Sequence, residues 1–230
     1  MAISRELLPR SAKAGDAPED WRERWNVPLV WPTAPRGKAA RAARLDLTDA
    51  ALVVIDIDKK AMDVGIQELR REDRRAGEAL ARRVYGTALP NIVRLVRRFR
   101  AQRRPTLFVQ WGWHRYQYPP LDPLPGEEVI VKRGRGAFGT SSLDAALRQK
   151  GTRTLVVAGA DITLCVASTV RGAVDHGYRV ALVGDACVCR AGPRMHAMML
   201  ATLGAGTARI VTTRQALAAA GRAAARGPLR

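Results

Sequence analysis

The chain has 230 residues, of which 47% are hydrophobic, and its 39 Lys and Arg residues outnumber its 21 Asp and Glu residues to give a formal net charge of +18. This length suits one sizeable core, and no apolar run approaches the roughly 20 residues that a membrane span needs, so we expect one soluble domain without a membrane anchor. Three cysteines do not form a disulfide framework, and Met1 to Arg10 precede no secretory apolar segment, so we predict a cytoplasmic protein.

The positive charge is spread along the chain. Arginine pairs recur from Arg70-Arg71 to Arg103-Arg104, in a sequence that is rich in Ala and Arg throughout. A basic, nucleic-acid-associated protein is one alternative. It predicts an affinity for nucleic acid that falls as the salt concentration rises and that is not lost when Cys165 is changed to Ala. We favour a solvated basic surface with no nucleic-acid partner.

Residues 1–48 show no steady hydrophobic periodicity, and they combine several prolines with Trp21, Trp25 and Trp31. We therefore predict an extended N-terminal arm. A tryptophan can bury a large apolar area, so these side chains are expected to pack on the body of the protein or on a neighbouring subunit. The preferred interpretation is an oligomer contact.

From residue 51 onward, predicted strands alternate with predicted helices. Continuous apolar runs predict buried strands over residues 51–55, 106–111, 129–132, 154–159, 178–183 and 209–212. Apolar stripes and capping residues predict helices over residues 77–102, with a break at Pro90, and over 141–150, 164–176 and 194–203. This order predicts an α/β fold with a mostly parallel six-stranded sheet and helices on both faces. The domain is expected to span residues 49–217, with fraying from residue 215 and a basic tail over 218–230.

Ligands of a parallel sheet gather at the carboxyl ends of its strands. Asp56 follows the first predicted strand, Trp111 and Lys132 end the second and third, and Cys165 follows the turn after the fourth. A thiol in the first turn of a helix is favoured as thiolate, a strand-end carboxylate can take its proton, and Lys132 can stabilise the ionised pair. Taken singly, each residue has a structural alternative, namely a small buried cysteine, a strand cap or a solvated charge.

The residues of this rim and their neighbours resemble the isochorismatase-like cysteine hydrolase superfamily, which includes nicotinamidases and N-carbamoylsarcosine amidohydrolases. The likeness runs in order over about residues 50–217 and rests on Ile55-Asp56, Lys132, Gly136-Ala137-Phe138, Thr140-Ser141-Ser142-Leu143, Val157-Ala158-Gly159, Cys165-Val166, Ala173, Gly177-Tyr178, Val183-Gly184-Asp185-Ala186, His196 and Thr212-Thr213.

The resemblance implies a three-layer Rossmann-like fold and a catalytic triad of Asp56, Lys132 and Cys165. It also implies a non-proline cis peptide at Ala160-Asp161, and an oxyanion hole made by the backbone N–H groups of Asp161 and Cys165. Members of the superfamily often form homodimers or homotetramers, and we expect such a homo-oligomer here.

The sequence departs from the superfamily in the loop after Asp56, which reads Ile57-Asp58-Lys59-Lys60-Ala61 instead of Met-Gln-Asn-Asp-Phe or a close relative. The resemblance therefore does not cover substrate contacts from that loop. With only three histidines in the chain, we predict no catalytic metal, and no organic cofactor is needed.

Four further residues are predicted to bind the substrate. Trp111, Trp113 and Phe138 are candidates to line a pocket for a flat or apolar group, with core packing as an equal alternative for Phe138. Arg135, close to Lys132, is a candidate to bind an anionic group of the substrate, with a solvated loop as the alternative.

The function predicted from the sequence is cysteine-dependent hydrolysis of a carbon-nitrogen bond, in an amide, ureido or lactam group of a small molecule, through a thioester. One alternative is an isochorismatase-type vinyl-ether hydrolase that uses Asp56 without the thiol and would survive Cys165→Ser. Another is a catalytically silent binding or assembly protein, in which Cys165 has ordinary reactivity.

Overall fold

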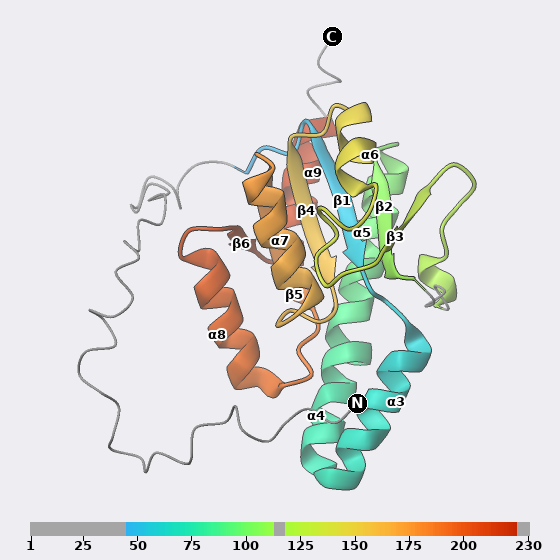
Figure 1. Cartoon of the computed structure of the whole chain (residues 1–230), viewed down its shortest axis with the longest axis vertical. Coiled ribbons are helices and arrows are strands. Elements are labelled where there is room, and N and C mark those ends of the chain that lie inside the picture. The colour runs from blue at the N-terminus through green and yellow to red at the C-terminus, as the bar shows by residue number, and fades with distance from the viewer. Residues whose placement is uncertain (1–44, 113–117, 225–230) are drawn as a thin grey trace, which may run out of the picture. The chain divides into compact units, whose positions relative to one another are not determined.

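The structure is a computed structural model of the chain, and it describes residues 45–112 and 118–224 (Figure 1). The predicted arm up to residue 44, Trp113 and residues 225–230 of the predicted tail lie outside the described residues.

The described residues form a six-stranded sheet in the order β3-β2-β1-β4-β5-β6, and every neighbouring pair of strands is parallel. This architecture confirms the predicted α/β fold. The strands are β1 (Ala50–Ile55), β2 (Thr106–Trp111), β3 (Glu128–Lys132), β4 (Thr154–Gly159), β5 (Arg179–Cys187) and β6 (Arg209–Val211).

The helices between the strands include one that the sequence patterns did not predict, α3, in which only Gly65 and Ile66 are buried. So narrow an apolar stripe gives little helical periodicity to detect. The helical segments are α3 (Lys59–Glu72), α4 (Arg74–Arg83), the π-helix η2 (Val84–Ala88), α5 (Leu89–Ala101), the 3-10 turn η3 (Pro119–Leu121), α6 (Leu143–Gln149), α7 (Cys165–Asp175), α8 (Gly192–Gly204) and α9 (Thr213–Ala224).

The predicted break at Pro90 corresponds to the change from η2 to α5. Pro90 is the second residue of α5, and it has no backbone N–H to donate to the preceding turn. The helical path therefore continues through the π-helix instead of ending. A membrane span is absent from the two described ranges, since none of their helices combines the necessary length and apolarity.

Helices cover both faces of the sheet, and the alternation of side chains along β1 shows how (Figure 1). Leu52 and Val54 belong to a buried apolar cluster with residues of α5 and α9, whereas Ala51, Val53 and Ile55 belong to a cluster with residues of α6 and α7. Because β1 is buried on both faces, its sequence is continuously apolar instead of alternating. The two clusters together form the core.

The C-terminal helix α9 corrects the expectation that the chain frays after residue 215. Its first residue is tied to β5, because the backbone N–H and the hydroxyl of Thr213 both donate to Oδ1 of Asp185, at 2.7 and 2.8 Å. The buried apolar side chains of α9 are all alanines, at spacings of three and four residues. In a segment rich in alanine, such a stripe is not recognised from hydrophobicity. These alanines are Ala216, Ala219, Ala220 and Ala223.

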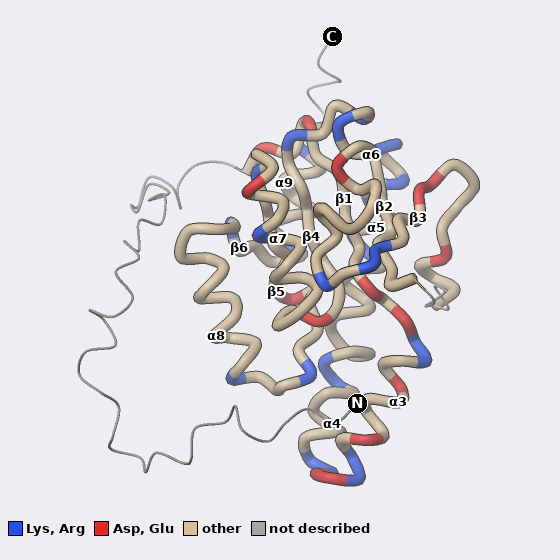
Figure 2. Tube along the Cα trace, in the orientation of Figure 1, with Lys and Arg blue, Asp and Glu red and all other residues tan. Residues whose placement is uncertain are grey.

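Charged residues of both signs are interspersed over the described part of the molecule (Figure 2). The tip formed by α3 and α4 carries arginines together with Glu72, Asp73 and Glu78, and several charges there are paired within one helix, such as Arg74 with Glu78 at 3.1 Å.

The sheet order places a topological switch point between β1 and β4, because the chain fills the sheet outward from β1 on one side and outward from β4 on the other. Crevices at the carboxyl ends of such strands are the usual ligand sites of doubly wound sheets. Asp56 follows β1, and the turn that leads to Cys165 follows β4, so both lie at this point.

Candidate active site

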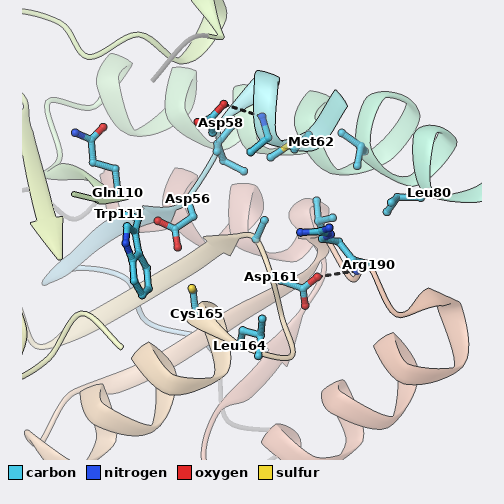
Figure 3. A pocket seen from close by; sticks show the side chains of 15 residues that line it. Asp56, Asp58, Met62, Leu80, Gln110, Trp111, Asp161, Leu164, Cys165 and Arg190 are labelled. Atoms are coloured by element: carbon cyan, nitrogen blue, oxygen red, sulfur yellow. Dashed lines mark hydrogen bonds between the residues drawn. The ribbon is translucent and has the colours of Figure 1, made fainter. Parts of the chain in front are cut away.

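Asp56 lies directly after β1, and its backbone adopts φ = 48°, a left-handed conformation that is rare outside glycine and that recurs at functional sites. Its backbone N–H donates to the carbonyl of Val109 at 2.8 Å, which ties the residue to β2. The side chain is 18% exposed, and its carboxylate lies between Trp111 and Cys165 (Figure 3).

Lys132 is the last residue of β3, and its side chain has no exposed surface. Its ammonium has three N–H donors and three polar neighbours: Oδ2 of Asp56 at 2.9 Å, Sγ of Cys165 at 3.3 Å and the carbonyl of Gly134 at 3.3 Å. It also lies 4.2 Å from the centroid of the Trp111 ring, which is its register partner on β2. Lys132 therefore connects the carboxylate to the thiol.

Cys165 is the first residue of α7 and is partly buried. Burial and, second, the neighbouring Asp56 carboxylate together raise the pKa of its thiol to about 11, against the opposing effect of Lys132. The direction of this shift is opposite to the expectation that the first turn of the helix favours a thiolate, because desolvation and a negative neighbour both favour the protonated form. At neutral pH the sulfur carries its proton and needs a base before it can attack.

The turn before Cys165 is held by the side chain of Asp161. Its Oδ1 accepts from the backbone N–H and the hydroxyl of Thr163, at 2.8 and 2.6 Å, and its Oδ2 accepts from the backbone N–H of Arg190 at 2.7 Å. The peptide bond between Ala160 and Asp161 is cis. The backbone N–H groups of Asp161 and Cys165 have no hydrogen-bond acceptor among the described residues. The sequence predictions named Asp161 only for its backbone, although Asp-x-Thr is a pattern that side-chain turns use.

A cavity of about 220 Å³ opens beside Asp56 and Cys165 (Figure 3). Its walls come from the ends of β1 and β2, from α3, α4 and η2, and from the segments after β4 and β5. They are mostly apolar. The lining residues are Asp56, Ile57, Asp58, Ala61, Met62, Leu80, Val84, Gln110, Trp111, Ala160, Asp161, Leu164, Cys165, Val188 and Arg190.

The predicted substrate-binding residues have different positions in the structure. Trp111 lines the cavity, and Trp113 lies outside the described residues. Phe138 does not line it, because its ring packs against His176 and Tyr178, with centroids 4.9 and 5.6 Å away. Arg135 is exposed and does not line it either.

The sequence predictions missed the wall contributed by α3, α4 and η2, together with Gln110 and Arg190. Met62 could not be assigned to a pocket because α3 was not predicted. Leu80 and Val84 belong to the predicted helix over residues 77–102, but an apolar stripe does not distinguish a pocket wall from the core. The sequence signal nearest to Arg190 is its position a few residues beyond a predicted buried strand. Within residues 45–112 and 118–224, no three His, Cys, Asp or Glu side chains group closely enough to hold a metal ion.

The family model of the isochorismatase domain matches residues 50–215. The isochorismatase family protein YddQ of Bacillus subtilis (strain 168) is 43% identical over 65 residues, which cover 28% of this chain and 36% of that protein. The ureidoacrylate amidohydrolase RutB of Pseudomonas savastanoi pv. phaseolicola is 36% identical over 87 residues, which cover 38% of this chain and 35% of that protein. The chain thus spans little more than a third of the curated relatives it matches.

Solved structures extend the likeness over more of the fold. The crystal structure of an isochorismatase from Pseudomonas putida KT2440 is similar with a TM-score of 0.59 and 27% sequence identity, covering 75% of this chain and 92% of that one.

Proposed function

Since the chain belongs to the isochorismatase family, we propose that it is a hydrolase that cleaves a carbon-nitrogen bond of a small molecule, in an amide, ureido or lactam group, through a thioester on Cys165. The observation that carries this proposal is the Lys132 ammonium, which contacts the Asp56 carboxylate at 2.9 Å and the Cys165 sulfur at 3.3 Å beside a cavity. The name of the relative RutB, an amidohydrolase, supports the bond type.

The first step forms the thioester. Asp56 takes the thiol proton, and Oδ1 of this carboxylate is the suitable acceptor, because it is buried and lacks a hydrogen-bond partner among the described residues. The sulfur forms a bond to the substrate carbonyl carbon. The resulting oxyanion is stabilised by the backbone N–H groups of Asp161 and Cys165, each of which is worth about 3 kcal/mol in sites of this kind. The carbon-nitrogen bond then breaks, and Asp56 returns the proton to the leaving nitrogen.

The second step releases the acid. A water molecule gives a proton to Asp56 and forms a bond to the thioester carbonyl carbon, after which the carbon-sulfur bond breaks and the thiol regains the proton. Lys132 keeps its charge throughout. Its role is to stabilise the thiolate as it forms and to hold Asp56 against Cys165.

The elevated pKa of the thiol fits this sequence of events. A resting thiol with a pKa of about 11 is protected from unproductive oxidation and alkylation, and it gives its proton to Asp56 as its sulfur attacks the substrate. The base lies next to the sulfur, as proton transfer requires.

The proposal is tested by trapping the intermediate. The protein is incubated with a panel of amides, ureas and lactams, quenched in acid and examined by intact-mass spectrometry for an acyl adduct on Cys165 that hydroxylamine removes. We expect an adduct and turnover with wild type, and neither with Cys165→Ala. Turnover that survives Cys165→Ser would contradict the proposal and favour a vinyl-ether hydrolase that works without the thiol. The absence of adduct and of turnover over the whole panel, with a Cys165 of ordinary reactivity, would favour a silent family member.

A further inference from the structure

We infer that the outer face of α5 and α9 binds the phosphate backbone of a nucleic acid duplex. This inference goes beyond the proposed hydrolysis and does not depend on it, because neither helix contributes a residue to the lining of the cavity. It departs from the sequence-based expectation of no nucleic-acid partner. That expectation considered the arginines along the chain, whereas the fold gathers several of them on one face.

Helices α5 and α9 lie side by side, on the face of the sheet opposite to α6 and α7 (Figure 1). Near their starts, the side-chain amide of Asn91 donates to the carbonyl of Asp185 at 3.0 Å, and the carboxylate of Asp185 accepts from Thr213, the first residue of α9. Near their ends, the side-chain amide of Gln102 donates to the carbonyl of Ala220 at 3.1 Å. The two helices therefore run in the same direction and form one layer.

This layer carries arginines and no acidic residue, since neither helix contains Asp or Glu. Its exposed arginines are Arg94, Arg97 and Arg98 on α5 and Arg214 on α9, and they define the α5/α9 face. None of these four side chains forms an ion pair with a carboxylate of residues 45–112 or 118–224. The acidic partners found on α3 and α4 are therefore missing from this face.

The three arginines of α5 are close together. Arg97 and Arg98 follow Arg94 by three and four residues, so all three project from the same side of the helix, about 6 Å apart along its axis. The other side of α5 is buried in the core, which fixes the arginines toward solvent. Like charges at this spacing repel one another, and an anion that lies across them removes this repulsion.

The side chains that the face lacks narrow the kind of anion. A helix on a membrane surface inserts large apolar side chains between the lipid headgroups, and the core of a protein interface is apolar or aromatic. Among the described residues, the exposed large hydrophobic side chains all belong to elements other than α5 and α9. An arginine face without such groups fits neither a membrane nor an acidic protein.

The choice between a single strand and a duplex follows from the aromatic residues. Proteins that bind single strands stack the bases on exposed rings. The aromatic residue of α5 is Phe99, which is fully buried, and α9 has none. A duplex keeps its bases stacked inside and presents closely spaced phosphates, to which arginine donates hydrogen bonds in pairs. The duplex is therefore the polyanion that matches this face, and its sequence is not read.

The test measures binding of the 230-residue chain to a fluorescently labelled DNA duplex of mixed sequence, by fluorescence anisotropy over a range of salt concentrations. The triple variant Arg94→Gln/Arg97→Gln/Arg98→Gln removes three charges from the α5/α9 face. Because all three side chains are exposed, we expect the variant to fold, and urea denaturation checks that it does.

The matched control removes three exposed arginines from another part of the molecule. It is Arg71→Gln/Arg74→Gln/Arg75→Gln, at the tip formed by α3 and α4, where Glu72 and Asp73 lie between the arginines. The two triple variants have the same net charge. A difference between them therefore reports on the α5/α9 face and not on the total charge of the chain.

We expect wild type to bind the duplex with an affinity that falls steeply as salt rises. Each lost phosphate contact lowers the slope of log affinity against log salt by about 0.9, so the α5 variant should lower this slope by about 2 to 3. Its affinity should fall at least about tenfold, which the loss of one charged hydrogen bond already gives. The slope of the control should change by less than about 1. Equal losses in the two triple variants would overturn the inference, and so would a wild type without salt-dependent binding.

Arg214→Gln gives an independent readout on α9, and it keeps the inference testable if the triple variant is unstable. We expect it to lower the slope by about 1, whereas Arg194→Gln, which removes an exposed arginine of α8, should leave the slope unchanged. Cys165→Ala should bind the duplex as wild type does, so a failure of the proposed hydrolysis leaves this inference standing. Equal slopes in wild type and Arg214→Gln would overturn the two-helix face.

Competitors distinguish the classes of anion. Unlabelled duplex should displace the labelled duplex at a much lower concentration of charge than polyglutamate or phosphatidylserine vesicles do. Displacement by either of these at the same concentration of charge would overturn the assignment to a nucleic acid duplex.

Discussion

The Lys132 ammonium lies 2.9 Å from Oδ2 of Asp56, and the Lys132 side chain has no exposed surface. Charges removed from water depend on their partners, so the loss of one member of such a pair leaves the other desolvated and uncompensated. Removing one partner of this ion pair should therefore destabilise the fold as well as disrupt the site.

Replacing Lys132 by Met is expected to lower the free energy of unfolding by about 3 kcal/mol, because it leaves the Asp56 carboxylate without its cationic partner. Urea denaturation measures the loss. The double variant Asp56→Asn/Lys132→Met should lose less than the sum of the single variants, since it leaves no unpaired charge. Lys150→Met is the matched control: Lys150 pairs with Glu128 at 2.5 Å, but its side chain is 29% exposed, and surface pairs contribute at most about 1 kcal/mol. Equal losses at the two lysines would contradict the prediction.

The alkylation of Cys165 by iodoacetamide should follow an alkaline pH profile. Its pKa of about 11 places the rise in rate above pH 9, whereas an ordinary thiol titrates near about 8.5. Asp56→Asn removes a charge that raises this pKa, so it should speed alkylation at pH 8 while it stops turnover. Lys132→Met removes an opposing charge and should slow alkylation at that pH. Mass spectrometry from pH 6 to 11 gives the profiles, and a midpoint near 8.5 in all three proteins would refute the prediction.

Most of the fold could be predicted from the sequence, because β1, β2 and β4 are buried on both faces and read as continuous apolar runs. The two errors have physical causes. Helix α3 has only a short apolar stripe, in which Ile66 is buried and Met62 and Leu69 are partly buried. Helix α9 buries alanines, which hydrophobicity patterns hardly distinguish from an exposed Ala-rich tail.

For the candidate site, the sequence identified the residues at the strand ends, because the carboxyl ends of parallel strands share one edge. Asp56, Lys132 and Cys165 are close together for that reason. The remaining walls depend on how α3 and α4 fold over the cavity, and Arg190 enters it from the loop after β5. Neither strand order nor sequence spacing encodes such tertiary placements. The sequence analysis therefore named Phe138 and Arg135 as substrate-binding candidates, although neither lines the cavity.

Cys187 should make the fold sensitive to alkali. It is fully buried, and burial raises the pKa of its thiol to about 12. Below about pH 8.5 both the folded and the unfolded thiol carry a proton, so pH has no effect there. Above that pH the unfolded thiol releases its proton while the folded thiol keeps it, and the free energy of unfolding falls by about 2 kcal/mol by pH 10.

Urea denaturation between pH 7 and 10 measures this fall in the free energy of unfolding. Cys187→Ala should reduce the fall by about 2 kcal/mol, whatever its effect on stability at pH 7. Cys189→Ala, whose thiol pKa is also raised by burial, is the comparison of similar size. An unchanged slope in Cys187→Ala would show that the buried thiol is not the cause.

The Trp111 ring should support the charge of Lys132. The ammonium lies 4.2 Å from the ring centroid, and a cation-π contact with a desolvated cation contributes about 2 kcal/mol. We expect Trp111→Leu to lose about that much stability together with most of the turnover. Trp111→Phe, which keeps an aromatic face, should lose less of both. Similar losses in the two variants, measured by urea denaturation and product formation, would indicate that the size of the side chain matters and its π-system does not.

Gly159 should be essential to the placement of Cys165, the proposed nucleophile. It ends β4 with φ = 136°, and a Cβ atom there would lie 2.1 Å from the carbonyl oxygen of Ile55 on β1. Gly159→Ala must therefore separate β1 from β4 at the point from which Asp56 and the turn to Cys165 extend. Gly126→Ala is the matched control, because Gly126 also has a positive φ of 88° but no atom within 4 Å of the position of its Cβ.

The control should lose only about 1 kcal/mol, the cost of a left-handed alanine. Gly159→Ala should lose several kcal/mol, as overpacked and strained sites do, and it should disrupt the contacts among Asp56, Lys132 and Cys165. Urea denaturation gives the stabilities, and the alkaline profile of Cys165 alkylation reports on the site. Where the folded variant remains populated, we expect the midpoint of that profile to move toward the ordinary value of about 8.5, because the thiol is no longer buried beside the carboxylate. Equal stability losses at the two glycines, with an unchanged Cys165 profile, would show that the close approach of β4 to β1 is not needed to position the nucleophile.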